Sequence, residues 1–116
     1  MAATILNPTK LGRNSVTDLP ALASAAADTS IGSNKYIVIP YGRDDKLVLE
    51  ISASSADTVK ILKGNGYAAA DEDLEVLSAA TGSKVVVVET AKYGIDGKII
   101  VDVAGANGKC CAMELM

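Results

Sequence analysis

Residues 84–103 read KVVVVETAKYGIDGKIIVDV, and the fold class is decided within this stretch. Its first part, residues 84–89, is a continuous apolar run of the kind found in a strand that is covered on both faces. Its last part, Lys98–Val103, alternates apolar and polar residues, as in a strand with one buried face. Between the two, Asp96 and Gly97 form a dipeptide that favours a tight hairpin turn. The stretch therefore predicts a strand, a turn and a second strand.

The same pattern of short strands and turns extends over most of the chain. We expect further strands at residues 35–40, 46–52, 58–63, 74–77 and 109–115. Turn-forming residues separate them at 41–45, 54–57, 64–66, 81–83 and 104–108. Strands that recur about every 8–14 residues with turns between them are typical of a sandwich or barrel. We therefore predict an all-β fold, an antiparallel β-sandwich of about seven or eight strands.

The alternation also predicts which side chains form the core. The chain has four Tyr and neither Phe nor Trp, so the core must be aliphatic. In residues 46–52 the odd-numbered positions are apolar, and in residues 109–115 we place Cys111, Met113 and Leu115 inward. The predicted core residues are Leu49, Ile61, Val86, Val88, Ile99, Val101 and Met113.

Residues 1–32 differ from the rest of the chain. They are rich in Ala, Ser, Thr, Asn and Pro and show no sustained hydrophobic period. We therefore divide the chain into an extended N-terminal arm, residues 1–32, and a β-sandwich domain, residues 33–116. Apolar residues are nevertheless spaced along the arm, whereas an ordinary disordered tail is more polar. The candidate partner-binding side chains of the arm are Ile5, Leu6, Leu11, Leu19 and Leu22.

An arm of this kind suits strand addition to a larger partner, or a contact along a groove of that partner. Two alternatives remain open for the same segment. In the first alternative, the segment is a loosely ordered terminus. In the second, residues 16–22 supply the first strand of the sandwich.

Charge and composition argue against several classes of function. The net charge is −3 and there is no basic run, so the electrostatic footprint of a nucleic-acid-binding protein is missing. No apolar stretch approaches the ~20 residues of a membrane span, and residues 1–10 lack the charged and apolar regions of a secretory signal. Cys110 and Cys111 are adjacent, too close for an ordinary disulfide, and they fit synthesis in a reducing cytoplasm. We expect neither a nucleic-acid nor a membrane partner.

The sequence offers no constellation of catalytic or cofactor-binding residues. It has no histidine, the commonest general base and transition-metal ligand. The acidic run at residues 71–73 lacks the spaced oxygen ligands of a calcium loop and is interpreted as a solvated turn. Residues 89–92 (ETAK) resemble the E-T-D-K lysine motif of lipoyl carrier domains, with Ala91 in place of the Asp, which makes Lys92 a candidate carrier lysine. We predict no catalytic site, no metal site and no cofactor.

Several blocks of sequence together have a recognisable arrangement. An Ala-, Thr- and Pro-rich beginning precedes residues 32–39 (GSNKYIVI). Residues 87–93 (VVETAKY) are followed by residues 96–102 (DGKIIVD), and then by a last strand at residues 111–115 (CAMEL). From residue 32 to residue 115 this pattern resembles the small head decoration, or capsid cement, proteins of tailed bacteriophages and prophages.

The resemblance implies a β-sandwich on the outer capsid surface that binds the major capsid protein lattice, stabilises the head and has no catalytic residues. It implies a location in the virion after synthesis in the host cytoplasm. Family members bind as monomers or as trimers, so the resemblance leaves self-association open. The alternatives are another small virion protein (tail-tube, head-completion or fibre-base), a lipoyl-like carrier domain, or a cell-surface adhesion module, against which the missing secretory signal argues.

Overall fold

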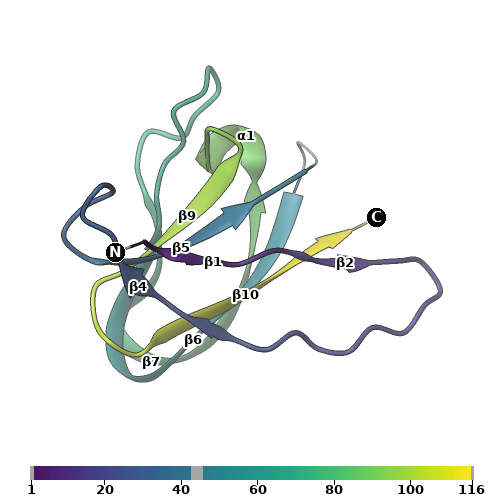
Figure 1. The fold of residues 1–116 in the computed structure, drawn as a ribbon, viewed down its shortest axis with the longest axis horizontal. Coiled ribbons are helices and arrows are strands. Elements are labelled where there is room, and N and C mark those ends of the chain that lie inside the picture. Colours follow the sequence, from purple (N-terminus) through teal and green to yellow (C-terminus); the bar gives the residue numbers. More distant parts are fainter. Residues whose placement is uncertain (1, 43–45, 116) are drawn as a thin grey trace.

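The structure, a computed structural model, describes residues 2–42 and 46–115, apart from the side chain of Leu115. Within these residues it contains ten strands and one short helix, and strands account for 56% of the chain (Figure 1). The predicted all-β class is thereby confirmed. The elements are β1 (Thr4–Ile5), β2 (Thr9–Leu11), β3 (Ala23–Ser24), β4 (Ala26–Ala27), β5 (Lys35–Pro40), β6 (Lys46–Ile61), β7 (Leu74–Glu89), α1 (Thr90–Tyr93), β8 (Gly94–Ile95), β9 (Lys98–Val103) and β10 (Gly108–Leu115).

The long strand β6 is the centre of the sheet. It pairs with β7 along one side and with β10 and then β9 along the other, always antiparallel. Its register with β7 shifts after Ala53, and on β7 Ala79 and Gly82 adopt positive φ angles of 49° and 138°. Bulges of this kind absorb extra residues and bend a strand without reversing it. The turns predicted at residues 54–57 and 81–83 are therefore wrong, because the chain continues through both places as bent strand.

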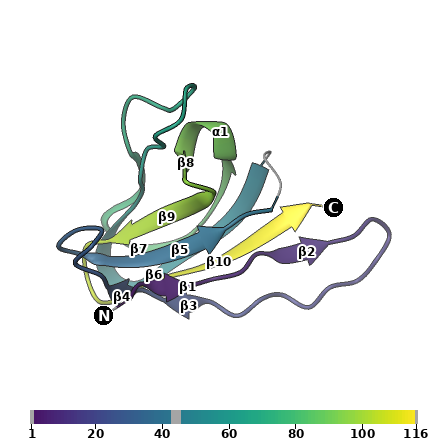
Figure 2. The same ribbon diagram turned by 45° about the horizontal axis from the view of Figure 1, so that its top comes forward.

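The N-terminal strands join the two ends of this curled sheet. β1 and β4 pair with the free side of β5, while β2 and β3 pair with the free side of β10. Figure 2 shows β1 and β2 following one another along the chain, with β2 beside β10. The β1–β5 and β10–β2 pairings are parallel. Within the described residues all ten strands belong to one mixed sheet, and the antiparallel sandwich predicted from the sequence is not confirmed.

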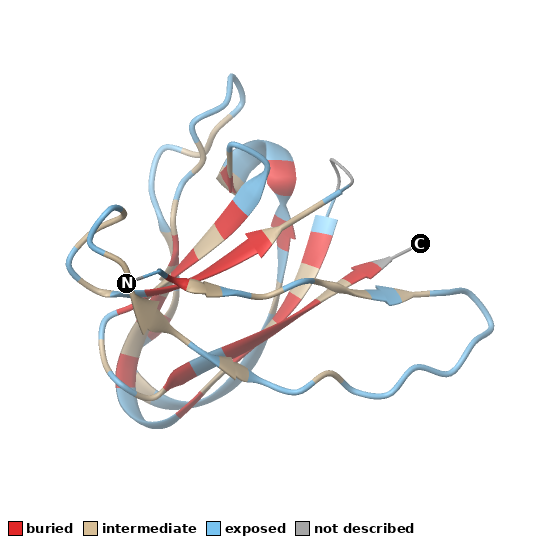
Figure 3. Ribbon diagram, in the orientation of Figure 1, coloured by how far each residue is buried: buried red, intermediate tan, exposed pale blue. Residues whose placement is uncertain are grey.

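The main core is formed by buried residues of β5, β6, β7, β9 and β10, whose buried positions are coloured red in Figure 3. The predicted core residues that are fully buried are Leu49, Ile61, Val88, Ile99 and Val101. Val86 packs against them from β7. Met113 is only half-buried, because β10 has the opposite phase and turns Cys110 and Ala112 toward the core, with Ala112 opposite Leu49. The inward placement of Cys111 and Met113 is therefore wrong, although Cys111 is buried outside the main core, and the prediction for Leu115 lies outside the described side chains.

The valine run of β7 is covered on one face only. Val88 is fully buried, whereas Val85 and Val87 are 69% and 57% exposed. Among the described residues β7 has β6 as its one partner strand, so it lies at an edge of the sheet. The interpretation of this run as a strand covered on both faces is therefore wrong, since its outer face is open to solvent.

The turn predicted at Asp96 and Gly97 is confirmed, but the strand that precedes it and pairs with β9 is the short β8 and not residues 84–89. The two strands pair antiparallel and leave Asp96 and Gly97 as the two turn residues. Their φ angles are 51° and 81°. A two-residue turn whose twist matches that of the strands needs positive φ at both positions, which explains the Asp-Gly dipeptide.

The two adjacent cysteines are both buried as free thiols. Burial raises the pKa of the Cys110 thiol to about 12, with smaller contributions from Cys111 and Glu50, and burial also raises the pKa of the Cys111 thiol. Because the thiolate is the reactive form, we expect iodoacetamide to modify the folded protein roughly 100-fold or more slowly than the urea-unfolded chain. Mass spectrometry of timed samples measures this, and rapid modification of either thiol under native conditions would contradict it.

Candidate functional site

A loop formed by residues 12–22, which we call the N-terminal loop, leaves the sheet between β2 and β3 (Figures 1 and 2). Its apolar side chains are open to solvent: Val16 is 99% exposed, Leu19 76% and Leu22 37%. None of these residues lies in a strand, so the alternative in which residues 16–22 form the first strand of a sandwich is wrong. The loop therefore displays apolar side chains away from the body of the protein.

Both ends of the N-terminal loop are fixed to the body. β2 and β3 pair with two neighbouring parts of the same strand, β10. The hydroxyl of Thr4 donates to the carbonyl of Ser24 at 2.7 Å, and the backbone N–H of Ala3 donates to the Asp28 carboxylate at 3.0 Å. Hydrogen bonds from the Ser30 side chain and then from Ala3 hold the pKa of the Asp28 carboxyl below its usual value. The loop is thus held at both ends, unlike a free tail.

Two of the five candidate partner-binding residues contribute to the fold. Leu6 packs against the main core, and its backbone N–H donates to the carbonyl of Val38 at 2.9 Å. Leu11 is half-buried at the end of β2. Burial leaves these two side chains little surface to offer a partner.

The other three candidates are exposed, but the structure does not bring them all together. Leu19 and Leu22 lie on the N-terminal loop, whereas Ile5, at 61% exposure, lies on β1. Sequence reasoning missed Val16 because the four residues that begin with it have the composition of a short strand. The one sequence feature that could have identified Val16 as a candidate is an apolar side chain within a segment that has no hydrophobic period. Partner binding by these residues stays a prediction.

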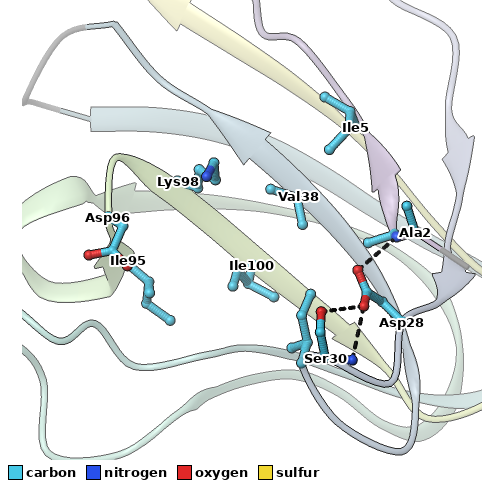
Figure 4. A pocket seen from close by; sticks show the side chains of 11 residues that line it. Ala2, Ile5, Asp28, Ser30, Val38, Ile95, Asp96, Lys98 and Ile100 are labelled. Atoms are coloured by element: carbon cyan, nitrogen blue, oxygen red, sulfur yellow. Dashed lines mark hydrogen bonds between the residues drawn. The ribbon is translucent and has the colours of Figure 1, made fainter.

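Ile5 borders a hollow of about 300 Å³ on the outer side of β5 and β9 (Figure 4). Val38 and Ile100 supply part of its apolar lining, and Lys98 is its cationic side chain. Asp28 also lines it, but both carboxylate oxygens already accept hydrogen bonds from Ala3 and Ser30. The hollow therefore offers mainly apolar surface, and among the described residues Lys98 and Asp96 are the charged side chains that line it without hydrogen bonds such as those of Asp28.

The remaining candidate groups of the sequence are the acidic run at residues 71–73 and Lys92. Within the described residues no three His, Cys, Asp or Glu side chains are grouped as a metal site. Asp73 accepts the backbone N–H of Lys63 at 2.8 Å, which ties the two ends of the loop between β6 and β7. Lys92 is exposed on the one-turn helix α1, not at the tip of a hairpin as in the carrier motif that it resembles.

No protein-family model, no curated protein and no solved structure matches this chain. The part of the chain that the structure describes has no helix of the length and apolar character needed to cross a membrane. The feature that distinguishes the site is its geometry, a β-rich body that displays an apolar loop between two fixed ends.

Proposed function

We propose that this protein is a capsid decoration protein of a tailed bacteriophage, which binds the outer surface of the major capsid protein lattice and stabilises the head. The N-terminal loop carries this proposal, because it displays Val16 and Leu19 at 99% and 76% exposure. The β-rich fold and the resemblance of residues 32–115 to decoration proteins support it. A structural role of this kind needs no catalytic residue, metal or cofactor.

Exposed apolar side chains on a fixed loop favour docking on another protein. Full burial of Val16 or Leu19 would contribute about 1.5–3 kcal/mol each. Ordering a flexible segment offsets part of such a gain, and a loop that is fixed at both ends has less freedom to lose than a free tail. The N-terminal loop is therefore a better contact than an arm of the same composition.

Binding to the assembled lattice explains how such a protein would stabilise a head. A protein that binds the mature lattice and not its dissociated subunits stabilises the lattice by its binding free energy. In this proposal the curled sheet is a sandwich-like body on the capsid surface, and the loop reaches the capsid protein beneath or beside it. Many copies of moderate affinity then sum their contributions over the shell.

Replacement of both loop side chains tests the proposal. We expect Val16→Ser with Leu19→Ser to lower binding to undecorated capsids of the encoding phage by roughly tenfold or more, because most of the apolar contact is removed. Co-sedimentation with capsids measures the binding. Tyr67→Ser is the matched control, since Tyr67 is also a fully exposed apolar side chain, on the loop between β6 and β7.

Substitution is preferable to truncation here, because residues before the loop form β1 and β2 of the sheet. The thermal midpoint of the double variant should stay close to that of the wild type, since both side chains are exposed. Full binding by the double variant would exclude the N-terminal loop as the contact. Absence of binding by the wild-type protein would exclude the decoration function itself.

A further inference from the structure

The outer edge of β7 is an unpaired sheet edge. β6 is the one strand paired with β7 in the described part of the chain, although β7 spans 16 residues. The part that carries the valine run, residues 82–89, has no proline and only two charged residues, Lys84 and Glu89. Natural edge strands are usually protected by charges, proline or a covering element, because their free backbone groups bind other strands. This edge has little such protection.

An apolar row of side chains leads across the outer face to that edge. Residues opposite one another in an antiparallel pair point to the same face of the sheet. Val87 of β7 lies opposite Val48 of β6, and Val48 lies opposite Met113 of β10. Val85, the next outward side chain of β7, is 69% exposed. The row therefore ends in two exposed valines at an open edge.

We propose that the outer edge of β7 pairs with β7 of a second copy of this chain, antiparallel and around a two-fold axis. An axis perpendicular to the sheet places residues of the same face opposite one another. With the axis at Val86, Val85 of each copy lies opposite Val87 of the other. β-branched residues in such cross-strand positions stabilise a sheet. The valine run is thus complementary to itself in this register.

Charge favours the same arrangement. Lys84 and Glu89 lie near the two ends of the valine run and are both exposed. In the antiparallel register with the axis at Val86, Lys84 lies opposite Val88 of the other copy and Glu89 lies opposite Ser83, so that no like charges face one another. Parallel pairing would place Lys84 beside Lys84 and Glu89 beside Glu89, which is repulsive.

A two-fold contact of this kind closes on itself. Each copy uses its one open β7 edge, and no second edge of the same kind is left to extend the assembly. The dimer presents two N-terminal loops, and the proposal does not depend on what those loops bind.

Sedimentation velocity of the purified protein, without capsids, tests the dimer. At about 100 μM protein, where even a micromolar dissociation constant gives a populated dimer, we expect the wild type to be mainly dimeric. Val87→Lys should shift it to the monomer. The matched control, Val16→Lys, makes the same change at an exposed valine of the N-terminal loop and should remain dimeric. A monomeric wild type, or a Val87→Lys variant as dimeric as the control, would overturn the proposal.

Disulfide trapping tests the register. Val85 faces Val87 of the second copy in the proposed dimer, so an oxidised mixture of Val85→Cys and Val87→Cys should cross-link at least about tenfold more than either variant alone. The native cysteines are buried and do not compete. Equal cross-linking in all three samples would overturn the register, and no cross-link in any sample would overturn pairing through β7.

Discussion

Replacing Leu49 with alanine is expected to lower the free energy of unfolding by about 2–5 kcal/mol. Leu49 is fully buried in β6, opposite Val86 of β7 on one side and Ala112 of β10 on the other. The backbones of these three strands are held by their pairing, so they cannot move together to fill the space that the leucine leaves. The loss is then a large part of the total stability, which for a domain of this size is about 5–15 kcal/mol. Urea unfolding followed by circular dichroism measures it.

Lys46→Ala is the control for this experiment. Lys46 begins the same strand but its side chain is exposed, so we expect a change within about 0.5 kcal/mol. Losses of similar size for the two variants would contradict the burial of the odd-numbered residues of β6. A shift of one residue in a strand exchanges its two faces, and the two substitutions would then exchange their effects.

Local patterns predicted the longer strands, β5, β6, β7, β9 and β10, because side-chain alternation is a local property. Lys35–Pro40 and Lys98–Val103 are strands with the predicted bounds. The Asp96–Gly97 turn was equally predictable, since its backbone angles restrict the residues that fit. In each case the information lies within a few consecutive residues.

Strand pairing is not a local property, and the sequence alone was insufficient to predict which segments pair. Residues 54–57 and 81–83 have the composition of turns, yet they lie side by side in the bent parts of β6 and β7. The small polar residues that favour a turn also permit a bulge, and only the partner strand decides between them. In β10, neighbouring cysteines and Ala112 are all small and apolar, so the pattern does not show which of them face the core.

The same limit applies to the candidate site. Leu6 and Leu19 look alike in the sequence, each in a stretch without a hydrophobic period. Leu6 is partly buried because β1 pairs with β5, whereas Leu19 is exposed because the chain leaves the sheet after β2. The exposed edge of β7 was also unpredictable, since a run of four valines is compatible with a central strand.

Replacing Asp57 with alanine is the second change for which we expect a large effect. Asp57 is 97% buried in β6, where its carboxylate accepts the backbone N–H groups of Gly108 at 2.8 Å and of Asn107 at 3.0 Å. These two groups begin β10, and Gly108 is itself buried. Without the carboxylate, the buried N–H of Gly108 and the partly buried N–H of Asn107 lose their acceptor, at about 1–3 kcal/mol for a fully buried donor. We expect the free energy of unfolding to fall by about 2–4 kcal/mol.

Asp57→Asn separates this hydrogen-bonding role from the effect of volume. Both N–H groups bond to the same oxygen, Oδ2, while Oδ1 is buried without a partner among the residues that the structure describes. An asparagine can place its carbonyl oxygen at the Oδ2 position and keep both bonds, although they become weaker because the acceptor is neutral. The asparagine variant should therefore lose clearly less stability than the alanine variant in urea unfolding. Equal losses would mean that the two hydrogen bonds do not hold the start of β10, and that the cavity left by alanine accounts for the effect.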